Sequence, residues 1–461
     1  MKLPPATGTR STRLVALAVV LQLSMGLLSV AVVDQPDVQR QPAATPSTAP
    51  EPRAAGAQRA APSAAEVERA ADTERNEQVE QLLAARSAAI LGRDRSAFLA
   101  TVDPRAAALQ ARQAAMFDAL AAVPIGTWEY ALDQRGGRAA DAALDLRYGR
   151  GLWWAPSVTL SYGLAGFDDI PTVDEHHLTF VGRDGRWLLG ADDDFDAVGG
   201  RTPRALWERG PVVAVRAPGV LALGHEDTSV LRNVASLASA AIPRVNEVWG
   251  EQWGKRVVVM VPSSAEEMAS LVDSTQDFSQ IAAVATAEVS DASGDDAIER
   301  ILVNPDTFTK LGQLGRRVVL THEVTHVAAR RATGPAVPAW LAEGLADYVG
   351  YKDVKVPLSV AARNLRKDVR AGQIPAALPT DEAFTGGNPA LAQAYEQSWL
   401  AVRLLVERYG EAELLAFYRA VGASEGSDSS VVLSTELRNA FGIDDVRLIA
   451  DWRAALQRQL G

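Results

Sequence analysis

The sequence predicts an α+β protein with an N-terminal membrane-spanning helix, a mixed middle domain and a mixed C-terminal domain. Three observations lead to this fold class. The chain has 461 residues, which is enough for roughly three domains. A long apolar stretch lies close to the N-terminus, and from residue 64 onward segments with helical spacing alternate with strand-like segments. We expect residues 1–33, 34–63, 64–197 and 198–461 to form separate units.

The charge and cysteine counts exclude several classes of protein. There are 46 Lys and Arg residues against 57 Asp and Glu residues, so the net charge is −11. Because an acidic surface repels phosphates, we expect no nucleic-acid partner. The absence of cysteine excludes disulfides, thiolate metal sites and cysteine nucleophiles. A metal ion would have to be bound by carboxylates and histidines, and the five histidines are His176, His177, His225, His322 and His326.

The N-terminal segment indicates the compartment. Residues 1–13 contain basic but no acidic side chains, and the apolar stretch at 14–33 is long enough for about one bilayer crossing. This order predicts a single-pass protein of the cell membrane whose C-terminal domain is extracytoplasmic. The alternative is a secreted protein with a cleaved signal peptide, since Ser29-Val30-Ala31 offers small residues to a signal peptidase. The Ala- and Pro-rich residues 34–63 predict a disordered linker.

The middle domain begins with helices and continues with short strands. Residues 64–122 have the spacing of amphipathic helices, and Gly and Asp turns separate the runs that follow. We expect a meander of antiparallel strands that ends in a hairpin with Asp184-Gly185 at its turn. This order resembles the nuclear transport factor two-like, cystatin-like cone over about residues 75–196, a fold that by itself names no function. The predicted strands lie at 128–132, 157–162, 177–181 and 186–189.

Several polar residues upstream of His322 are interpreted as ordinary. His176 and His177 are adjacent, so in a strand they would point to opposite faces and could not share a metal ion. His225 stands alone. The acidic run of Asp192, Asp193 and Asp194, with Asp196, lacks the Gly-containing twelve-residue loop of a calcium site and is predicted to be a solvated turn.

The C-terminal domain is predicted to mix strands with helices. An apolar run at 256–261 indicates a strand that is buried on both faces. The other expected strands lie at 212–215, 281–289 and 301–304. The expected helices lie at 229–249, from about 311 or 315 to 328, from 338 to 348, and at 390–410, 411–421 and 446–460.

The chemistry is predicted to lie in the helix that contains His322-Glu323-Val324-Thr325-His326. His322 and His326 are four residues apart and share one helical face, which lets two imidazoles bind one metal ion. Glu323 can then reach a water on that ion without being a ligand. The alternative is a buried helix with two ordinary histidines, but it would place the Glu323 carboxylate unpaired in an apolar core, at considerable cost.

The His-Glu-x-x-His motif and the following helix, with Pro338 near its start and Glu343-Gly344 within it, resemble the gluzincin metallopeptidases of the thermolysin-like, peptidase MA-like superfamily. The resemblance implies that Glu343 joins His322 and His326 as the third ligand of one Zn²⁺ ion per chain. It also implies that Asp347, one turn after Glu343, accepts a hydrogen bond from a ligand histidine. An edge strand at 281–289 or 299–304 would bind substrate.

The expected function is that of a zinc metallopeptidase, either an endopeptidase or an aminopeptidase-like hydrolase. It would cleave peptide or protein substrates with zinc-activated water and Glu323 as the general base. Tyr395, on a later helix, is the candidate for stabilising the tetrahedral intermediate, although it could equally be a packing aromatic. Tyr348 and Tyr351 are weaker candidates. The alternative function is a catalytically silent zinc-binding scaffold or binding protein of the cell envelope.

Overall fold

The structure is a computed structural model that describes residues 14–15, 63–133, 141–225, 228–272, 274, 277–289, 297–424 and 429–461. Its mixture of helices and strands agrees with the predicted α+β class. Of the predicted membrane-spanning stretch only Leu14 and Val15 are described, and they form the short strand β1 (Leu14–Val15). Residues 16–33 and the predicted linker up to residue 62 lie outside the described residues. No described helix is long and apolar enough to cross a bilayer.

The middle domain starts with three helices, as predicted. The first begins where the expected linker ends, because the Ser63 hydroxyl accepts from the Glu66 amide and the Glu66 carboxylate accepts from the Ser63 amide. This capping box satisfies two amides that the helix itself leaves unpaired. The helices are α1 (Ala64–Leu91), α2 (Arg95–Leu99) and α3 (Ala107–Leu120), and a short helix that was not predicted, α4 (Ala142–Tyr148), follows later.

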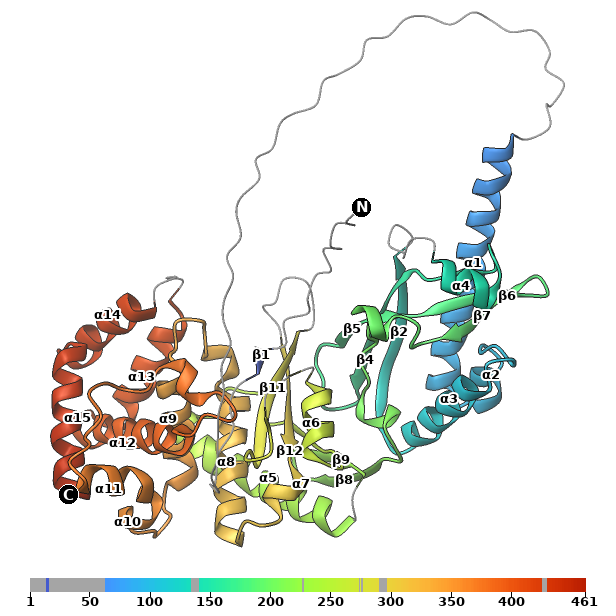
Figure 1. The fold of residues 1–461 in the computed structure, drawn as a ribbon. Helices are drawn as coiled ribbons and strands as arrows, with labels where there is room; N and C mark the ends of the chain where they lie inside the picture. The colour runs from blue at the N-terminus through green and yellow to red at the C-terminus, as the bar shows by residue number, and fades with distance from the viewer. Residues whose placement is uncertain are drawn as a thin grey trace, which may run out of the picture.

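The middle-domain strands are antiparallel but are divided between two sheets (Figure 1). The prediction of one strand at 177–181 is wrong in one respect, because Leu178 separates two strands. Its side chain is buried in the core beneath α1. The hairpin at Asp184-Gly185 is confirmed: both residues have positive φ, 50° and 78°, as its tight turn requires. One sheet consists of β2 (Ile125–Asp133), β4 (Ser157–Leu164) and β5 (Thr172–His177), and the other of β3 (Trp153–Trp154), β6 (Thr179–Arg183) and β7 (Arg186–Ala191).

The C-terminal domain is built on a six-stranded mixed sheet with the order β1-β11-β12-β10-β9-β8. Three central strands are parallel to one another, and β8 and β11 run antiparallel to their neighbours. The strand β9 was not predicted, because its apolar run directly follows β8 in a tight hairpin, with Gly219 at φ 73°. The strands are β8 (Val213–Ala217), β9 (Val220–Gly224), β10 (Val257–Val261), β11 (Ala283–Val289) and β12 (Ala297–Val303).

Both faces of this sheet are buried, each against a different partner. On one face Val257 and Val259 pack with α5 (Thr228–Trp249) and α8 (Gln313–Ala329). On the other face Val258 and Met260 pack with side chains of the middle domain. In Figure 1 the sheet accordingly lies between the C-terminal helices and the middle domain. The two domains therefore share one apolar core.

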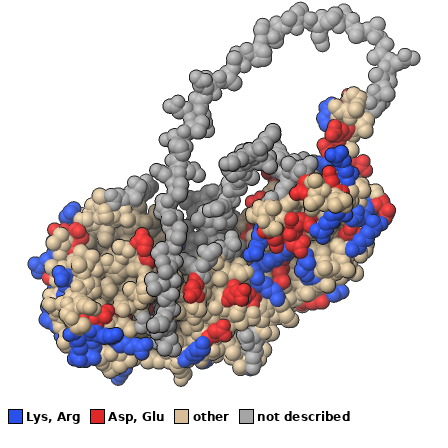
Figure 2. All heavy atoms as spheres, in the orientation of Figure 1, with Lys and Arg blue, Asp and Glu red and all other residues tan. Residues whose placement is uncertain are grey.

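Apart from α6, the remaining helices pack in the core on the α5 and α8 face of the sheet. Met268 and Leu271 of α6 pack instead in the core shared with the middle domain. The predictions at 390–410, 411–421 and 446–460 are confirmed to within a residue or two, whereas α14 was not predicted. Figure 2 shows that basic and acidic side chains alternate over the middle domain on the visible face. The helices are α6 (Ala265–Leu271), α7 (Pro305–Phe308), α9 (Ala339–Tyr351), α10 (Leu358–Ala361), α11 (Arg363–Arg370), α12 (Leu391–Tyr409), α13 (Glu411–Gly422), α14 (Ser429–Phe441) and α15 (Asp445–Leu460).

Candidate metal centre

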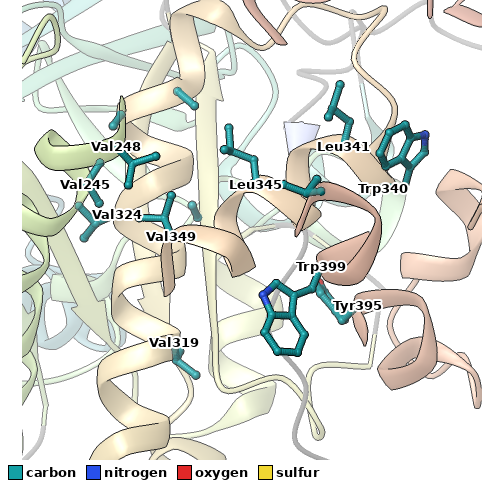
Figure 3. Close-up of a cluster of buried hydrophobic side chains, with 14 of the residues drawn as sticks. Val245, Val248, Val319, Val324, Trp340, Leu341, Leu345, Val349, Tyr395 and Trp399 are labelled. Atoms are coloured by element: carbon teal, nitrogen blue, oxygen red, sulfur yellow. The ribbon is translucent and has the colours of Figure 1, made fainter. Parts of the chain in front are cut away.

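The predicted metal ligands lie on two helices that are packed against each other, α8 and α9. Apolar side chains anchor both helices, among them Val319 and Val324 of α8 and Leu345 and Val349 of α9 (Figure 3). Gly350 permits the close approach, since a Cβ atom there would lie 3.1 Å from the Val318 carbonyl oxygen on α8. The polar side chains between the two helices are consequently held in a rigid, apolar frame.

Three side chains converge in this frame. The Nε2 atoms of His322 and His326 are 3.0 Å apart, and the Glu343 Oε2 atom lies 3.0 Å from the first and 3.3 Å from the second. His322 and Glu343 are buried, at 0% and 3% exposure, and the side chain of His326 is 9% exposed. The i, i+4 spacing and the helix that follows thus bring together the three predicted ligands.

The donor set and its spacing fit a zinc ion. Imidazole nitrogen and carboxylate oxygen are common zinc ligands at about 2.0–2.2 Å, and three such ligands of a tetrahedral ion lie about 3.3 Å apart. The observed separations of 3.0, 3.0 and 3.3 Å are close to this value. The three groups form the one His and carboxylate cluster of this kind found among the described residues.

Asp347 fixes the orientation of one imidazole. Its Oδ1 atom accepts a hydrogen bond from His322 Nδ1 at 2.9 Å, so that in the neutral ring the lone pair is on Nε2, which faces Glu343. Burial lowers the pKa of His322, but the hydrogen bonds to Asp347 and Glu343 outweigh burial and raise it to about 10. The cluster therefore favours positive charge at its centre.

Glu323 follows His322 directly in the chain, and its carboxylate accepts a hydrogen bond from the sheet. Its Oε2 atom accepts a hydrogen bond from the Ala285 amide of β11 at 2.7 Å, while Oε1 has no hydrogen-bond partner within the described part of the chain. Burial raises the pKa of Glu323 to about 7, although the two imidazoles lower it. The prediction of an edge strand at 281–289 or 299–304 was wrong, because β11 lies between β1 and β12, and β12 lies between β11 and β10.

The contact with Ala285 was not predicted. It uses a backbone amide, so no side-chain pattern marks it, and only the prediction of a strand at 281–289 pointed to the segment.

Tyr395, on α12, lies next to the predicted metal ligands. Gly344 makes this possible, because a Cβ atom at that position would lie only 2.5 Å from the Ser398 carbonyl oxygen of α12. The ring centroid of Tyr395 is 6.1 Å from that of His322 and 5.3 Å from that of Phe384. Its hydroxyl is buried without a partner among the described residues, and burial with the nearby carboxylates raises its pKa, so it stays a neutral donor.

Tyr348 and Tyr351 are engaged elsewhere. The Tyr348 hydroxyl donates to Glu411 Oε2 at 2.8 Å, and the ring of Tyr351 packs on Trp399 at 4.7 Å between centroids. Tyr348 is five residues after Glu343 on α9, so the two side chains lie on different faces of the helix. Of these three tyrosines, Tyr395 is the one whose hydroxyl is fully buried without a hydrogen-bond partner among the described residues.

The histidines outside this centre lie in the middle domain and at the end of β9. His176 and His177 occupy consecutive positions of β5, His176 buried and the His177 amide bonded to Thr202. The His225 ring bonds to the Pro211 carbonyl oxygen and to Glu267. In the described part of the chain, none of the three joins a candidate metal cluster.

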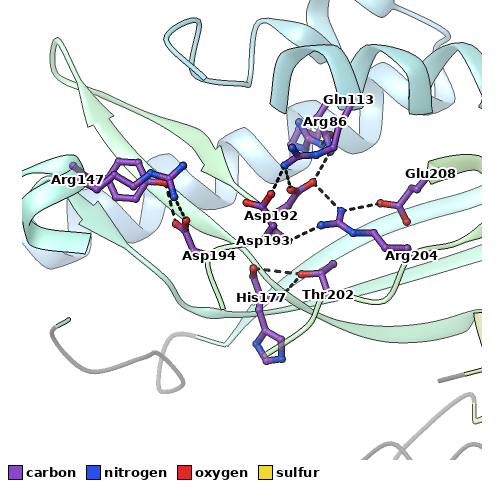
Figure 4. Close-up of polar contacts among 12 residues, drawn as sticks. Arg86, Gln113, Arg147, His177, Asp192, Asp193, Asp194, Thr202, Arg204 and Glu208 are labelled. Atoms are coloured by element: carbon purple, nitrogen blue, oxygen red, sulfur yellow. Dashed lines mark hydrogen bonds and ion pairs between the residues drawn. The ribbon is translucent and has the colours of Figure 1, made fainter. Parts of the chain in front are cut away.

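The prediction of a solvated turn at the acidic run holds for Asp193 and Asp196, which are exposed, but is wrong for Asp192 and Asp194. Asp192 is 2% exposed and accepts hydrogen bonds from Arg112, Gln113 and Arg204, and Asp194 pairs with Arg147 (Figure 4). Arg112 and Gln113 lie about eighty positions earlier in the chain, so no local pattern indicates that they bond to Asp192.

The chain has only weak similarity to known proteins. No protein-family model and no curated protein matches the chain. Two solved structures of a mutant M1 zinc metallopeptidase from Deinococcus radiodurans are similar in part. The one bound to a Tyr-Ser-Ala substrate has 14% identity and a TM-score of 0.30, with coverage of 66% of this chain and 61% of that chain. The second has 13% identity and a TM-score of 0.28, with coverage of 61% and 59%. The chain thus spans about three fifths of the length of those proteins.

Proposed function

We propose that this protein is a zinc-dependent peptidase and that His322, His326 and Glu343 hold the metal. The observation that carries the proposal is the convergence of three ligand atoms within 3.0–3.3 Å, with a buried carboxylate one residue after His322. A buried helix with two ordinary histidines does not account for this convergence, since a neutral His322 that donates to Asp347 through Nδ1 has no proton on Nε2 to give to Glu343.

The proposed reaction uses five side chains, because Glu323 and Tyr395 act on the substrate beside the three that would hold the metal. A bound zinc ion would lower the pKa of a water molecule toward ~7 and polarise a substrate carbonyl. Glu323 Oε1 takes a proton from the attacking water and returns it to the leaving amine nitrogen. The Ala285 amide holds the other carboxylate oxygen in place. The Tyr395 hydroxyl donates to the carbonyl oxygen as negative charge develops on it.

Replacing Glu323 by Gln tests this assignment in the zinc-loaded, full-length protein. The amide keeps the size of the side chain but cannot accept the proton, so cleavage of a mixed internally quenched peptide library should fall by about 10²–10⁴-fold at unchanged zinc content. Glu407→Gln, at an exposed pair on α12, is the matched control and should keep full activity. Aminoacyl-coumarin substrates in the same assay distinguish aminopeptidase from endopeptidase activity.

Two outcomes would contradict the proposal. Equal cleavage by wild type and Glu323→Gln would remove Glu323 from the reaction. Stoichiometric zinc with no cleavage by the wild type would favour the silent scaffold instead.

We further propose that the C-terminal domain functions outside the cytoplasm, either tethered or secreted. The support is the basic and apolar sequence of residues 1–33. Membrane fractionation with N-terminal sequencing of the purified protein tests the proposal. An intact N-terminus in the membrane fraction indicates an anchor, a new N-terminus near Ala31 in the soluble extracytoplasmic fraction indicates secretion, and cytoplasmic protein contradicts both.

A further inference from the structure

One histidine lies at the crossover between the two domains, residues 209–212, and the proposed peptidase reaction does not use it. His225 follows directly after β9, and its ring lies against the crossover. Gly210 makes room for the ring, since a Cβ atom at that position would lie 3.2 Å from His225 Nδ1. Trp207 and Val212, on either side of this contact, are buried in the apolar core that the two domains share. The histidine therefore sits where the domains join.

Both ring nitrogens of His225 face oxygen atoms. Nδ1 is 2.7 Å from the Pro211 carbonyl oxygen, and Nε2 is 2.9 Å from Glu267 Oε1 on α6. A carbonyl oxygen can only accept a hydrogen bond, so Nδ1 carries a proton. A neutral imidazole has a single N–H, so in the neutral ring Nε2 would present a lone pair to Glu267.

Glu267 is an ionised carboxylate. Burial raises its pKa, but the hydrogen bonds from His225 and Ser263 outweigh burial and lower the pKa to about 2. Its second oxygen, Oε2, accepts from the Ser263 amide at 2.9 Å and from the Ser263 hydroxyl. An ionised carboxylate has no proton to give to Nε2, so a neutral ring would set two lone pairs against each other. The contacts therefore fit an imidazolium, which donates from both nitrogens.

The pair of His225 and Glu267 is largely removed from water. The two side chains are 12% and 11% exposed. A hydrogen bond between two ionised groups is shorter and stronger than one between neutral groups, and little solvent is present here to screen it. Loss of the proton from the ring therefore has a structural consequence at this junction.

Other charged groups lie at the same junction. Arg209 of the crossover attracts Glu267 and so competes with the imidazolium for it. Glu208 is paired with Arg204, and Glu266, in the first turn of α6, is exposed. Within the described part of the chain, Glu267 is the carboxylate that pairs with the imidazole ring.

We propose that His225 is a pH-sensitive clasp, which in its protonated form ties the Pro211 carbonyl of the crossover to Glu267 of α6. When the ring loses its proton, one of the two hydrogen bonds is lost, because a neutral ring has a single N–H. The folded state favours the protonated ring, so the stabilisation is complete in acid. It is lost as the pH rises through the titration of the folded-state ring, above that of an ordinary histidine at ~6.5. This clasp is independent of the proposed peptidase activity.

Nitrogen-15 NMR of the full-length protein with labelled histidine tests the protonation state. The His225 signals are assigned by their loss in His225→Gln. At pH 7 both ring nitrogens of His225 should have the chemical shifts of protonated nitrogens, whereas an ordinary histidine is mostly neutral at this pH. Glu267→Gln should return the ring to the neutral form. Glu266→Gln, which removes an exposed carboxylate from the same helical turn, should leave the ring charged.

Urea unfolding at pH 6 and pH 9.5 measures the clasp itself. The unfolding midpoint of the wild type should exceed that of His225→Gln by about 0.3–0.5 M at pH 6, and this difference should fall by half or more at pH 9.5. Because the two proteins are compared at each pH, the titration of other groups largely cancels.

The controls keep the test decisive if a variant is unstable. If His225→Gln does not fold, Glu267→Gln is compared with Glu266→Gln at the same two pH values, with the same expectation, and the His225 signals are assigned by their shift in Glu267→Gln. The proposal is overturned if one ring nitrogen of His225 is unprotonated at pH 7 in the folded wild type, or if the difference in midpoint is the same at both pH values.

Discussion

Two buried polar clusters, one between α8 and α9 and one inside the middle domain, both contain groups without a hydrogen-bond partner among the described residues. In the first cluster an acceptor is unpaired, and in the second the unpaired groups are donors. Between the helices, two imidazole nitrogens converge with a carboxylate oxygen of Glu343, and Glu323 Oε1 nearby has no hydrogen-bond partner among the described residues. In the middle domain, Arg86 and Trp128 present donors while every nearby carboxylate is paired. Both clusters are enclosed by apolar side chains of similar kind.

The difference teaches that the chemistry of a buried cluster follows from its imbalance. A surplus of acceptors in a low-dielectric setting attracts a cation, and a surplus of donors attracts an anion. Neither cluster is balanced internally, whereas the buried pair of Arg300 and Asp168 at the junction of the domains is closely matched, with contacts of 2.8 and 2.7 Å.

The junction offers the largest expected effect. Asp168→Ala should lower the free energy of unfolding by about 3–5 kcal/mol, because it removes the carboxylate from a guanidinium that is 2% exposed. Asp118→Ala, in an exposed pair with Arg95, should cost at most about 1 kcal/mol. Urea unfolding followed by circular dichroism measures both. Two separate transitions, with only one shifted, would contradict the shared core.

The next effect concerns the unpaired hydroxyl of Tyr395. Tyr395→Phe keeps the ring packed on Phe384 but removes the donor, so kcat should fall about 10²–10³-fold, by about 2.7–4 kcal/mol, with little change in KM. Tyr348→Phe is the matched control, because its hydroxyl bonds to Glu411. Steady-state kinetics on a cleaved peptide decides the matter. An unchanged kcat would make Tyr395 a packing aromatic.

The middle cluster should contribute stability and not metal binding. Asp192→Asn should cost about 2–3 kcal/mol, because it weakens the bonds with Arg112 and Arg204. Burial raises the pKa of Asp192, but the two arginines hold it below the ordinary 3.8. The stabilisation is therefore present above pH 3.8 and lost as the pH falls through the lower, folded-state pKa.

Denaturant titrations across pH 3–7 compare Asp192→Asn with Asp193→Asn, whose side chain is 43% exposed. The first variant should differ from the wild type at neutral pH and approach it in acid. If Asp192→Asn lost bound zinc, the prediction would be wrong, because the middle cluster would then affect metal binding as well as stability.

The smallest expected effect is on the orientation of a metal ligand. Asp347→Asn removes the charge that His322 Nδ1 faces at 2.9 Å, so zinc affinity should fall about 10–100-fold. Asp353→Asn, exposed just beyond α9, should leave the affinity unchanged. Competition with a zinc-binding dye gives both constants. An affinity equal to that of the wild type would show that Asp347 does not support the ligand.

The two histidines of the candidate metal centre could be predicted because their geometry is local, since His322 and His326 share a helical face through their spacing alone. Glu343 lies on the next helix and was expected from the resemblance to the gluzincins, not from local geometry. Tyr395 could be placed only as a guess from its order in the chain, since its approach depends on Gly344 and the packing of α12.

The middle domain was less predictable because its polar contacts are long-range. Asp192 looked solvated in the sequence, yet its partners Arg112 and Gln113 lie about eighty residues away. The division of the strands into two sheets likewise depends on how Leu178 packs beneath α1, which periodicity does not reveal.

Anomalous X-ray diffraction at the zinc edge, from crystals of the full-length protein saturated with zinc, tests the central claim most directly. The account predicts one strong peak per chain within bonding distance of His322 Nε2, His326 Nε2 and a Glu343 carboxylate oxygen. A zinc-saturated crystal with no peak at these three atoms, or with its zinc bound elsewhere, would contradict it.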